Sequence, residues 1–231
     1  MIADKAQAFI VVTEGKVFVD GQKAISPAQP VREEARIEVR NTYEYVGRGA
    51  LKLKGAIEQF VVSVEGKICA DIGAATGGFT EILLKSGAVK VYAIDTAHGK
   101  LALKIRQDPR VVVIEKTDVR HMDELPEAVS LAVIDVSLIS LKEILPATAR
   151  LLEENGQLIA LLKPQYETRD QSMLRNGIIV DPAVREHIRD DMLHWVAENG
   201  WEVLGKMESP IQGTEGNVEY LLHLKKVKIH P

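Results

Sequence analysis

A strand, loop, helix and strand pattern between Gly66 and Asp95 constrains this chain more than any other feature. Its sequence, GKICADIGAATGGFTEILLKSGAVKVYAID, begins with a short apolar run that ends in Asp71. Glycines and a helical apolar pattern follow, and a second apolar run ends in Asp95. This order is typical of one unit of a parallel α/β sheet, in which glycines let the backbone approach a ligand closely. The stretch therefore predicts a nucleotide-like cofactor at the end of the first strand.

The spacing of the glycines favours one class of cofactor. A dinucleotide loop reads G-x-G-x-x-G, whereas Ala75 breaks that pattern here, and the phosphate loop G-x-x-x-x-G-K-[ST] is absent. A carboxylate at Asp71 would repel a diphosphate but would suit a cation with an amino group. We therefore expect S-adenosylmethionine (SAM) in preference to NAD or FAD, with Asp95 on the ribose diol. Glycines that merely turn the chain remain the alternative.

Composition limits the class of protein. The 231 residues suffice for one large domain and a small one, and the net charge of −4 means that any nucleic-acid surface must be a local patch. The single cysteine, Cys69, fits a reducing cytosol, so we expect a cytoplasmic protein. No apolar run reaches the roughly 18 residues of a membrane span, which argues against stable membrane insertion. The histidines show no metal-ligand grouping, so no metal is expected.

Apolar runs and helical patterns alternate along the chain after residue 48. We expect helices over 49–60, 100–106, 141–152 and 182–198, and further strands over 111–114, 131–134, 157–162, 201–207 and 218–224. Lys52 and Lys54 fall on or near the polar side of the first of these helices. The alternation predicts an α/β fold: a doubly wound, Rossmann-like sheet with helices on both faces and late antiparallel strands.

Polar side chains recur where the predicted strands end. Asp71, Asp95, Asp118, Asp135 and Lys163 each follow an apolar run. Ligands of doubly wound sheets bind outside the carboxyl ends of the strands. Each residue alone could be a solvated loop charge, but the five together favour a site at this edge of the sheet.

Residues 1–40 have a different pattern. Residues 6–12 fit a helix, residues 16–19 and 35–39 alternate as strands, and Asp20-Gly21 is a hairpin turn signal. A unit of about 40 residues is marginal alone. We expect a small α+β module that belongs to, or docks on, a larger one.

Five ordered motifs match a known family: Y-V-G-R-G-A-L-K-L, D-I-G-A-A-T-G-G-F-T, V-I-D-V-S-L-I-S, L-L-K-P-Q-Y-E and G-N-V-E-Y. They resemble the hemolysin-A/TlyA family of SAM-dependent rRNA ribose 2′-O-methyltransferases, which are related to the FtsJ/RrmJ enzymes. The resemblance implies an FtsJ-like methyltransferase domain over 43–231 and ribosomal RNA or a ribosomal subunit as partner. It also implies that residues 1–42 are a linker and a partial S-four-type RNA-binding module, without the family's first helix.

The resemblance also assigns residues. The family's Lys-Asp-Lys-Glu tetrad falls on Lys52, Asp135, Lys163 and Glu219. Asp118 would meet the adenine edge, and the complete set of expected cofactor contacts is Asp71, Gly73, Ala74, Gly77, Gly78, Phe79, Asp95, Asp118 and Asp135. The expected RNA contacts are Arg48, Lys54 and Tyr45.

The expected chemistry centres on Lys163, which would take or steer the proton of a ribose 2′-hydroxyl. A purely electrostatic role, stabilising the developing alkoxide, stays open. Base methylation commonly uses an Asn/Asp-Pro-Pro-aromatic loop, and Asp135-Val-Ser-Leu has no such prolines, so ribose methylation is preferred. Two rival classes remain: a membrane-lysing protein, and a non-catalytic RNA-binding protein that retains the fold.

Overall fold

The computed structural model describes residues 8–9, 11–12, 15–39, 45–213 and 215–227. The chain divides into two compact units, Met1–Val46 and Gly47–Pro231. The boundary predicted between residues 42 and 43 falls outside the described residues. The family-based identity of the first unit stays a prediction.

The N-terminal unit contains a small antiparallel sheet with the strand order β2-β1-β3. Its strands are β1 (Val17–Val19), β2 (Gln22–Lys23) and β3 (Ile37–Val39). Asp20 and Gly21 join the first two with φ angles of 50° and 81°. These positive angles fit the tight hairpin turn that the sequence predicts. Residues 8–9 and 11–12 of the expected first helix are helical, and the rest of that helix lies outside the described residues.

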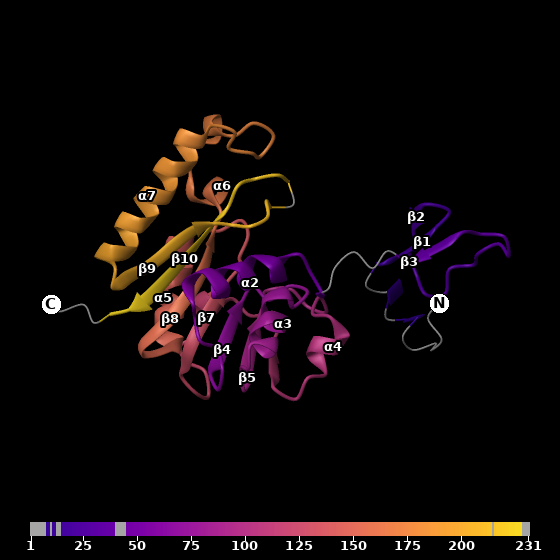
Figure 1. The fold of residues 1–231 in the computed structure, drawn as a ribbon, viewed down its shortest axis with the longest axis horizontal. Helices are drawn as coiled ribbons and strands as arrows, with labels where there is room; N and C mark the ends of the chain where they lie inside the picture. Colours follow the sequence, from indigo (N-terminus) through magenta and orange to yellow (C-terminus); the bar gives the residue numbers. More distant parts are fainter. Residues whose placement is uncertain (1–7, 10, 13–14, 40–44, 214, 228–231) are drawn as a thin grey trace. The chain divides into compact units, whose positions relative to one another are not determined.

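The second unit is built on a seven-stranded sheet with the order β6-β5-β4-β7-β8-β10-β9 (Figure 1). The strands from β6 to β8 run parallel, and β10 pairs antiparallel with both β8 and β9. The strands are β4 (Ile68–Ile72), β5 (Lys90–Ile94), β6 (Val111–Ile114), β7 (Val129–Ile134), β8 (Leu152–Leu162), β9 (Trp201–Glu208) and β10 (Tyr220–Lys226). The predicted doubly wound sheet with late antiparallel strands is confirmed.

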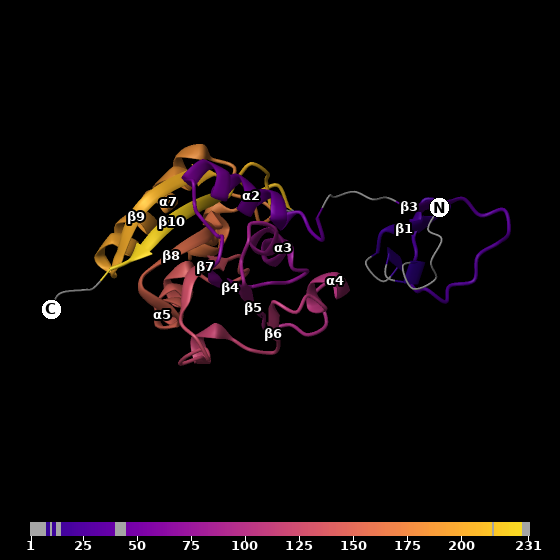
Figure 2. The same cartoon turned by 60° about the horizontal axis from the view of Figure 1, so that its bottom comes forward.

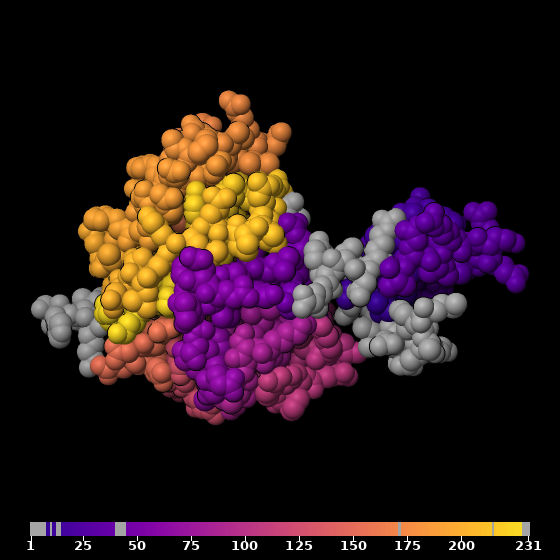
Figure 3. Space-filling model, viewed as in Figure 1, coloured from indigo at the N-terminus to yellow at the C-terminus, as the bar shows by residue number. Residues whose placement is uncertain are grey.

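Helices cover both faces of this sheet. They are α2 (Gly49–Phe60), α3 (Gly78–Lys85), α4 (Leu103–Arg106), α5 (Leu141–Leu151), α6 (Pro164–Glu167) and α7 (Pro182–Glu198), with short 3-10 turns η1 (Val119–His121) and η2 (Gln171–Met173). Helices α5 and α7 pack into the main apolar core with Ile72, Ile94 and Leu222. Helices α2 and α3 lie side by side on the opposite face (Figures 1 and 2). In Figure 3, purple α2 meets the yellow C-terminal strands.

The predicted element bounds are largely confirmed, and α2 and α7 begin and end where the sequence places them. The helix expected over 100–106 begins only at Leu103, because Ala102 is extended and its N–H donates to the Thr76 carbonyl at 3.1 Å. Strand β8 begins at Leu152 instead of residue 157. The pairing of β8 with β7 shifts register near this start, and a prediction from the spacing of apolar residues cannot detect such a shift.

The register of the parallel strands determines which side chains share the edge of the sheet. Ile72 lies opposite Ile94 on one side and Ile134 on the other. The residues that follow these three, Gly73, Asp95 and Asp135, therefore leave the sheet at one level.

Candidate active site

A pocket of about 480 Å³ opens at the ends of β4, β5, β6 and β7. Carboxylates line it at three points, Asp95, Asp118 and Asp135, and Ile94 and Ile144 give it apolar walls. This placement is the one that the strand ends predict, because four neighbouring parallel strands end on the same side. A cleft that combines apolar walls with hydrogen-bond acceptors has the chemistry that a nucleoside requires.

Gly73 lets the first loop pass close to the end of β7. Its φ is +87°, and a Cβ at this position would lie 2.4 Å from the carbonyl oxygen of Asp135. Any side chain would therefore clash with backbone that cannot easily move. Gly73 lines the pocket, so the close approach also leaves room for a ligand.

Asp95 holds the two loops that border the pocket. Its Oδ2 accepts a hydrogen bond from the N–H of Ala75, and its Oδ1 accepts one from the N–H of Ala97, both at 2.7 Å. Each carboxylate oxygen retains a further acceptor position. Asp95 can therefore organise the glycine loop and still accept hydrogen bonds from a ribose diol.

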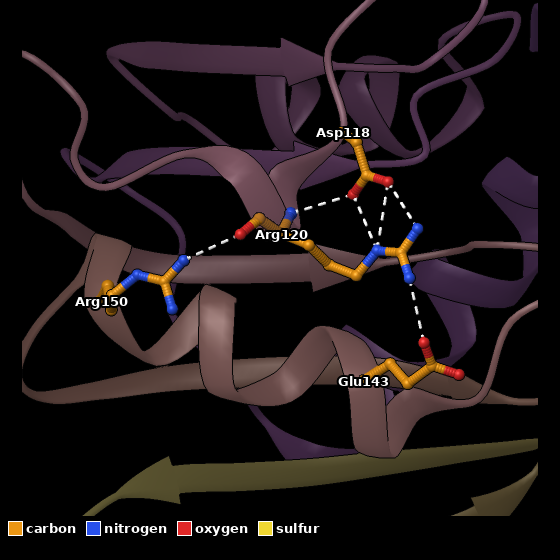
Figure 4. Close-up of polar contacts among 4 residues, drawn as sticks. All are labelled: Asp118, Arg120, Glu143 and Arg150. Carbon is orange, nitrogen blue, oxygen red and sulfur yellow. Dashed lines mark hydrogen bonds and ion pairs between the residues drawn. The ribbon is translucent and has the colours of Figure 1, made fainter.

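Asp118 is held tightly by Arg120 (Figure 4). Its carboxylate accepts from the backbone N–H, Nε and Nη2 of Arg120, the last at 2.7 Å, and Arg120 Nη1 also donates to Glu143 at 2.9 Å. Arg150 in turn donates to the carbonyl of Arg120. The Arg120 guanidinium lowers the pKa of Asp118 to about 2. An adenine amino group would have to share acceptors that Arg120 already uses, so the adenine contact of Asp118 stays a prediction.

Asp71 lies inside the protein and does not line the pocket. It pairs in register with Ala93 and Val133, below the edge of the sheet, and its side chain is fully buried. Its Oδ2 accepts from the Thr80 hydroxyl at 2.6 Å, and its Oδ1 is buried without a partner. Burial raises the pKa of Asp71 to about 7. A direct cofactor contact of Asp71 would require the loop above it to move, so that role also stays a prediction.

The remaining glycines of the loop serve close packing. A Cβ on Gly77 would lie 2.9 Å from the Leu101 side chain, and a Cβ on Gly78 would lie 3.0 Å from the Ala50 backbone nitrogen. The second contact is what lets α2 and α3 pack so closely. Phe79 is buried, and Ala74 borders a small cavity of about 10 Å³ beside the main pocket. The packing explains these residues without a ligand, so their contacts with the cofactor stay predictions.

The tetrad expected from the family resemblance forms two ion pairs. Lys163 Nζ lies 2.7 Å from Asp135 Oδ1, with side-chain exposures of 10% and 23%. Lys52 Nζ lies 2.5 Å from Glu219 Oε2, with exposures of 9% and 3%. Taking charges out of water is costly, so each of these buried lysines needs the carboxylate with which it pairs.

The periodicity predicts that Lys52 lies on or near the polar side of α2, but the structure shows that its side chain is buried. Buried Glu219 supplies the partner charge from the segment before β10, and long-range pairing of this kind is invisible in a local pattern. A Cβ added to Gly49, the first residue of α2, would lie 3.6 Å from Asp135 Oδ2, so α2 begins beside Asp135. The first turn of α2 thus brings the Lys52 pair toward the Lys163 pair.

A second set of contacts joins the segments that carry Asp135 and Lys163. Glu167, at the end of α6, accepts from the N–H of Leu141 at 2.8 Å and from the Ser140 hydroxyl at the start of α5. Burial raises the pKa of Glu167. Sequence reasoning missed this contact, because a Glu 26 residues from a helix start gives no local capping signal.

The three expected RNA contacts lie in different settings. Arg48 donates to the carbonyl of Gln212 at 2.8 Å and so holds the loop before Glu219. Lys54 is exposed on α2, 3.9 Å from Glu58. Tyr45, near the end of the N-terminal unit, is only 5% exposed, so its ring is not presented for stacking in this structure. Their roles toward RNA stay predictions.

A comparison with known families shows to which family the chain belongs. The model of the FtsJ-like methyltransferases matches residues 45–226, which is most of the chain and the whole of the sheet. The chain belongs to the FtsJ-like methyltransferase family. Membership confirms the expected fold, the methyltransferase activity and SAM as the cofactor.

Individual relatives of this FtsJ-like methyltransferase cover nearly all of it. Hemolysin A of Brachyspira hyodysenteriae is 40% identical over 95% of this chain and 92% of its own length. The 16S/23S rRNA (cytidine-2′-O)-methyltransferase TlyA of Mycobacterium tuberculosis is 40% identical over 96% of this chain and 84% of its own. A solved Streptococcus thermophilus protein with a provisional hemolysin name is 38% identical, with a TM-score of 0.79 over 98% of this chain and 84% of that one.

The residues of this FtsJ-like methyltransferase fit SAM. Asp95 could accept hydrogen bonds from hydroxyl groups, the apolar walls could hold a base, and the Asp135 carboxylate could attract a positively charged group. None of the helices in the described ranges combines the length and the apolar character that a membrane span requires. No group of three or more His, Cys, Asp or Glu side chains within the described ranges could hold a metal ion.

Proposed function

We propose that this protein transfers a methyl group from SAM to a ribose 2′-hydroxyl of ribosomal RNA, with Lys163 as the residue that takes the hydroxyl proton. The observation that carries the proposal is the Lys163–Asp135 ion pair, because Asp135 lines the pocket and holds the Lys163 amine 2.7 Å away. The TlyA relatives, named as cytidine-2′-O methyltransferases of rRNA, support the substrate class.

The chain's own residues would act on the sugar and not on the methyl group. SAM, when bound, supplies a methyl group activated by its positive sulfur. Lys163 must be neutral when it accepts the proton of the 2′-hydroxyl: the O–H bond breaks, an N–H bond forms, and the oxygen's electron pair bonds to the methyl carbon as the carbon–sulfur bond breaks. Asp135 then pairs with the lysine ammonium that results. The Lys52–Glu219 pair would hold the first turn of α2 beside this site.

The test is tritiated methyl transfer from SAM to deproteinised rRNA and to isolated ribosomal subunits. We expect the K163A variant to lose at least about 100-fold in rate, since a positioned general base contributes on the order of 10²–10⁴. K206A is the matched control, because Lys206 is a half-exposed lysine on β9 that pairs with Asp190 outside the pocket. Full activity of K163A would refute the proposal.

One further variant separates proton transfer from electrostatic stabilisation. In K163R the positive charge remains, but a guanidinium stays protonated and cannot accept the proton. A K163R rate as low as that of K163A supports Lys163 as the base. A K163R rate near that of the wild type would assign Lys163 an electrostatic role instead.

A further inference from the structure

Ser137 is a residue of the pocket to which the sequence assigns no role. It lies two residues after Asp135, is exposed and lines the pocket. Lys163, in contrast, is only 9% exposed and does not line it. The two meet directly, because Lys163 Nζ donates a hydrogen bond to Ser137 Oγ at 3.0 Å. Ser137 is thus a second pocket side chain, beside Asp135, that contacts the buried amine of Lys163.

The contacts of Lys163 use two of the directions around its nitrogen. Asp135 Oδ1 lies at 2.7 Å and Ser137 Oγ at 3.0 Å, and the ring centre of Tyr166 lies 6.0 Å away. A neutral amine has two N–H bonds and one lone pair. When both N–H bonds have acceptors, the lone pair must point in the remaining tetrahedral direction. With Asp135 alone, the amino group could rotate about its Cε–Nζ bond and turn the lone pair away from the substrate.

We propose that Ser137 is a positioning residue: its hydroxyl is the second acceptor, which fixes the rotation of the Lys163 amino group so that the lone pair faces the ribose hydroxyl. The inference rests on the proposed function, in which Lys163 takes the proton. Ser137 itself gains and loses no proton in this step. The charged groups of the tetrad do not supply this second acceptor. Asp135 already accepts from one N–H bond, and Glu219 pairs with Lys52.

The variants S137T and S137V test this role as a matched pair, since they have nearly the same shape and differ in the hydroxyl. The readouts are kcat and KM for methyl transfer to isolated ribosomal subunits, and Kd for S-adenosylhomocysteine by calorimetry. We expect S137V to lose about 10-fold in kcat, an order typical of lost orientation. KM and Kd should stay within about twofold, and S137T should recover most of the rate. Thermal melts of both variants establish that each is folded.

Three results would overturn the inference: an S137V kcat equal to that of the wild type, equal losses in S137T and S137V, or a loss of rate matched by an equal loss of affinity for S-adenosylhomocysteine. The K163A variant keeps the two proposals apart. If K163A is inactive while S137V is fully active, only the role of Ser137 fails. If K163A is active, the proposed function of Lys163 fails.

Discussion

Replacing Asp71 with Asn is expected to change how the stability of this protein depends on pH. Burial raises the pKa of Asp71 from 3.8 to about 7. Between these values the folded protein retains a proton that the unfolded chain has released, so the free energy of unfolding falls as pH rises, by up to about 1.4 kcal/mol per pH unit. By about pH 8 the buried carboxylate has cost the native state on the order of 4 kcal/mol, and D71N removes this cost.

The amide introduces a cost of its own. Thr80 can donate to the amide oxygen as it does to Asp71 Oδ2, but the amide NH₂ then takes the place of Oδ1, which has no partner. A buried polar group without a partner costs about 1–3 kcal/mol. Since this second cost does not vary with pH, the difference in stability between D71N and wild type isolates the charge of Asp71 when it is followed across pH.

The assay is urea unfolding followed by circular dichroism from pH 4 to pH 8. The stability of D71N relative to wild type should increase by about 4 kcal/mol over this range, and D71N should be the more stable protein at pH 8. D123N, which removes an exposed carboxylate, controls for the change in net charge. A relative stability of D71N that stays constant within about 0.5 kcal/mol across the range would refute the burial argument.

Three further changes should have measurable effects. K52M removes one member of a buried ion pair and leaves Glu219 unpaired, so its free energy of unfolding in urea should fall by about 3–5 kcal/mol; a fall below about 1 kcal/mol would contradict the burial of the pair. R120M should lose about 1 kcal/mol at pH 7, because Arg120 lowers the pKa of Asp118 to about 2 but is 39% exposed. Stability that a depressed carboxyl pKa provides is lost as pH falls, so the gap in urea-derived stability between R120M and wild type should close toward pH 2, and a gap that widens there would contradict the assignment. G73A places a Cβ 2.4 Å from a backbone oxygen at a φ of +87°, so it should bind S-adenosylhomocysteine at least about 10-fold more weakly by calorimetry and melt at a lower temperature; unchanged affinity would show that the loop is not tightly packed.

The strands and helices could be predicted because their signals are local. The glycine loop and the acids after β5 and β7 lie next in the sequence to the strands and helices that they join. The alternation of strands and helices also predicts that β4, β5 and β7 run parallel, because parallel strands are joined by crossover connections. Parallel strands end at the same edge of the sheet, and the observed register places Gly73, Asp95 and Asp135 together at that edge.

The contacts that decide the chemistry could not be predicted in this way. Lys52 and Glu219 are 167 residues apart, and the resemblance to a family named both as tetrad members without showing that they pair. The burial of Asp71 follows from its depth in the sheet, which a run of apolar residues ending in an acid does not reveal. The contact of Ser137 with Lys163 depends on where β7 and β8 end relative to each other, and no spacing in the sequence expresses that.

The position of the transferred methyl group tests the central claim most directly. Ribosomal subunits methylated by the wild-type protein can be digested to nucleosides and analysed by mass spectrometry, which separates methyl groups on ribose from methyl groups on bases. We predict a 2′-O-methylated nucleoside that is present with wild-type protein and K206A and absent with K163A. A methyl group found on a base, or a ribose methyl group formed equally well by K163A, would contradict the account.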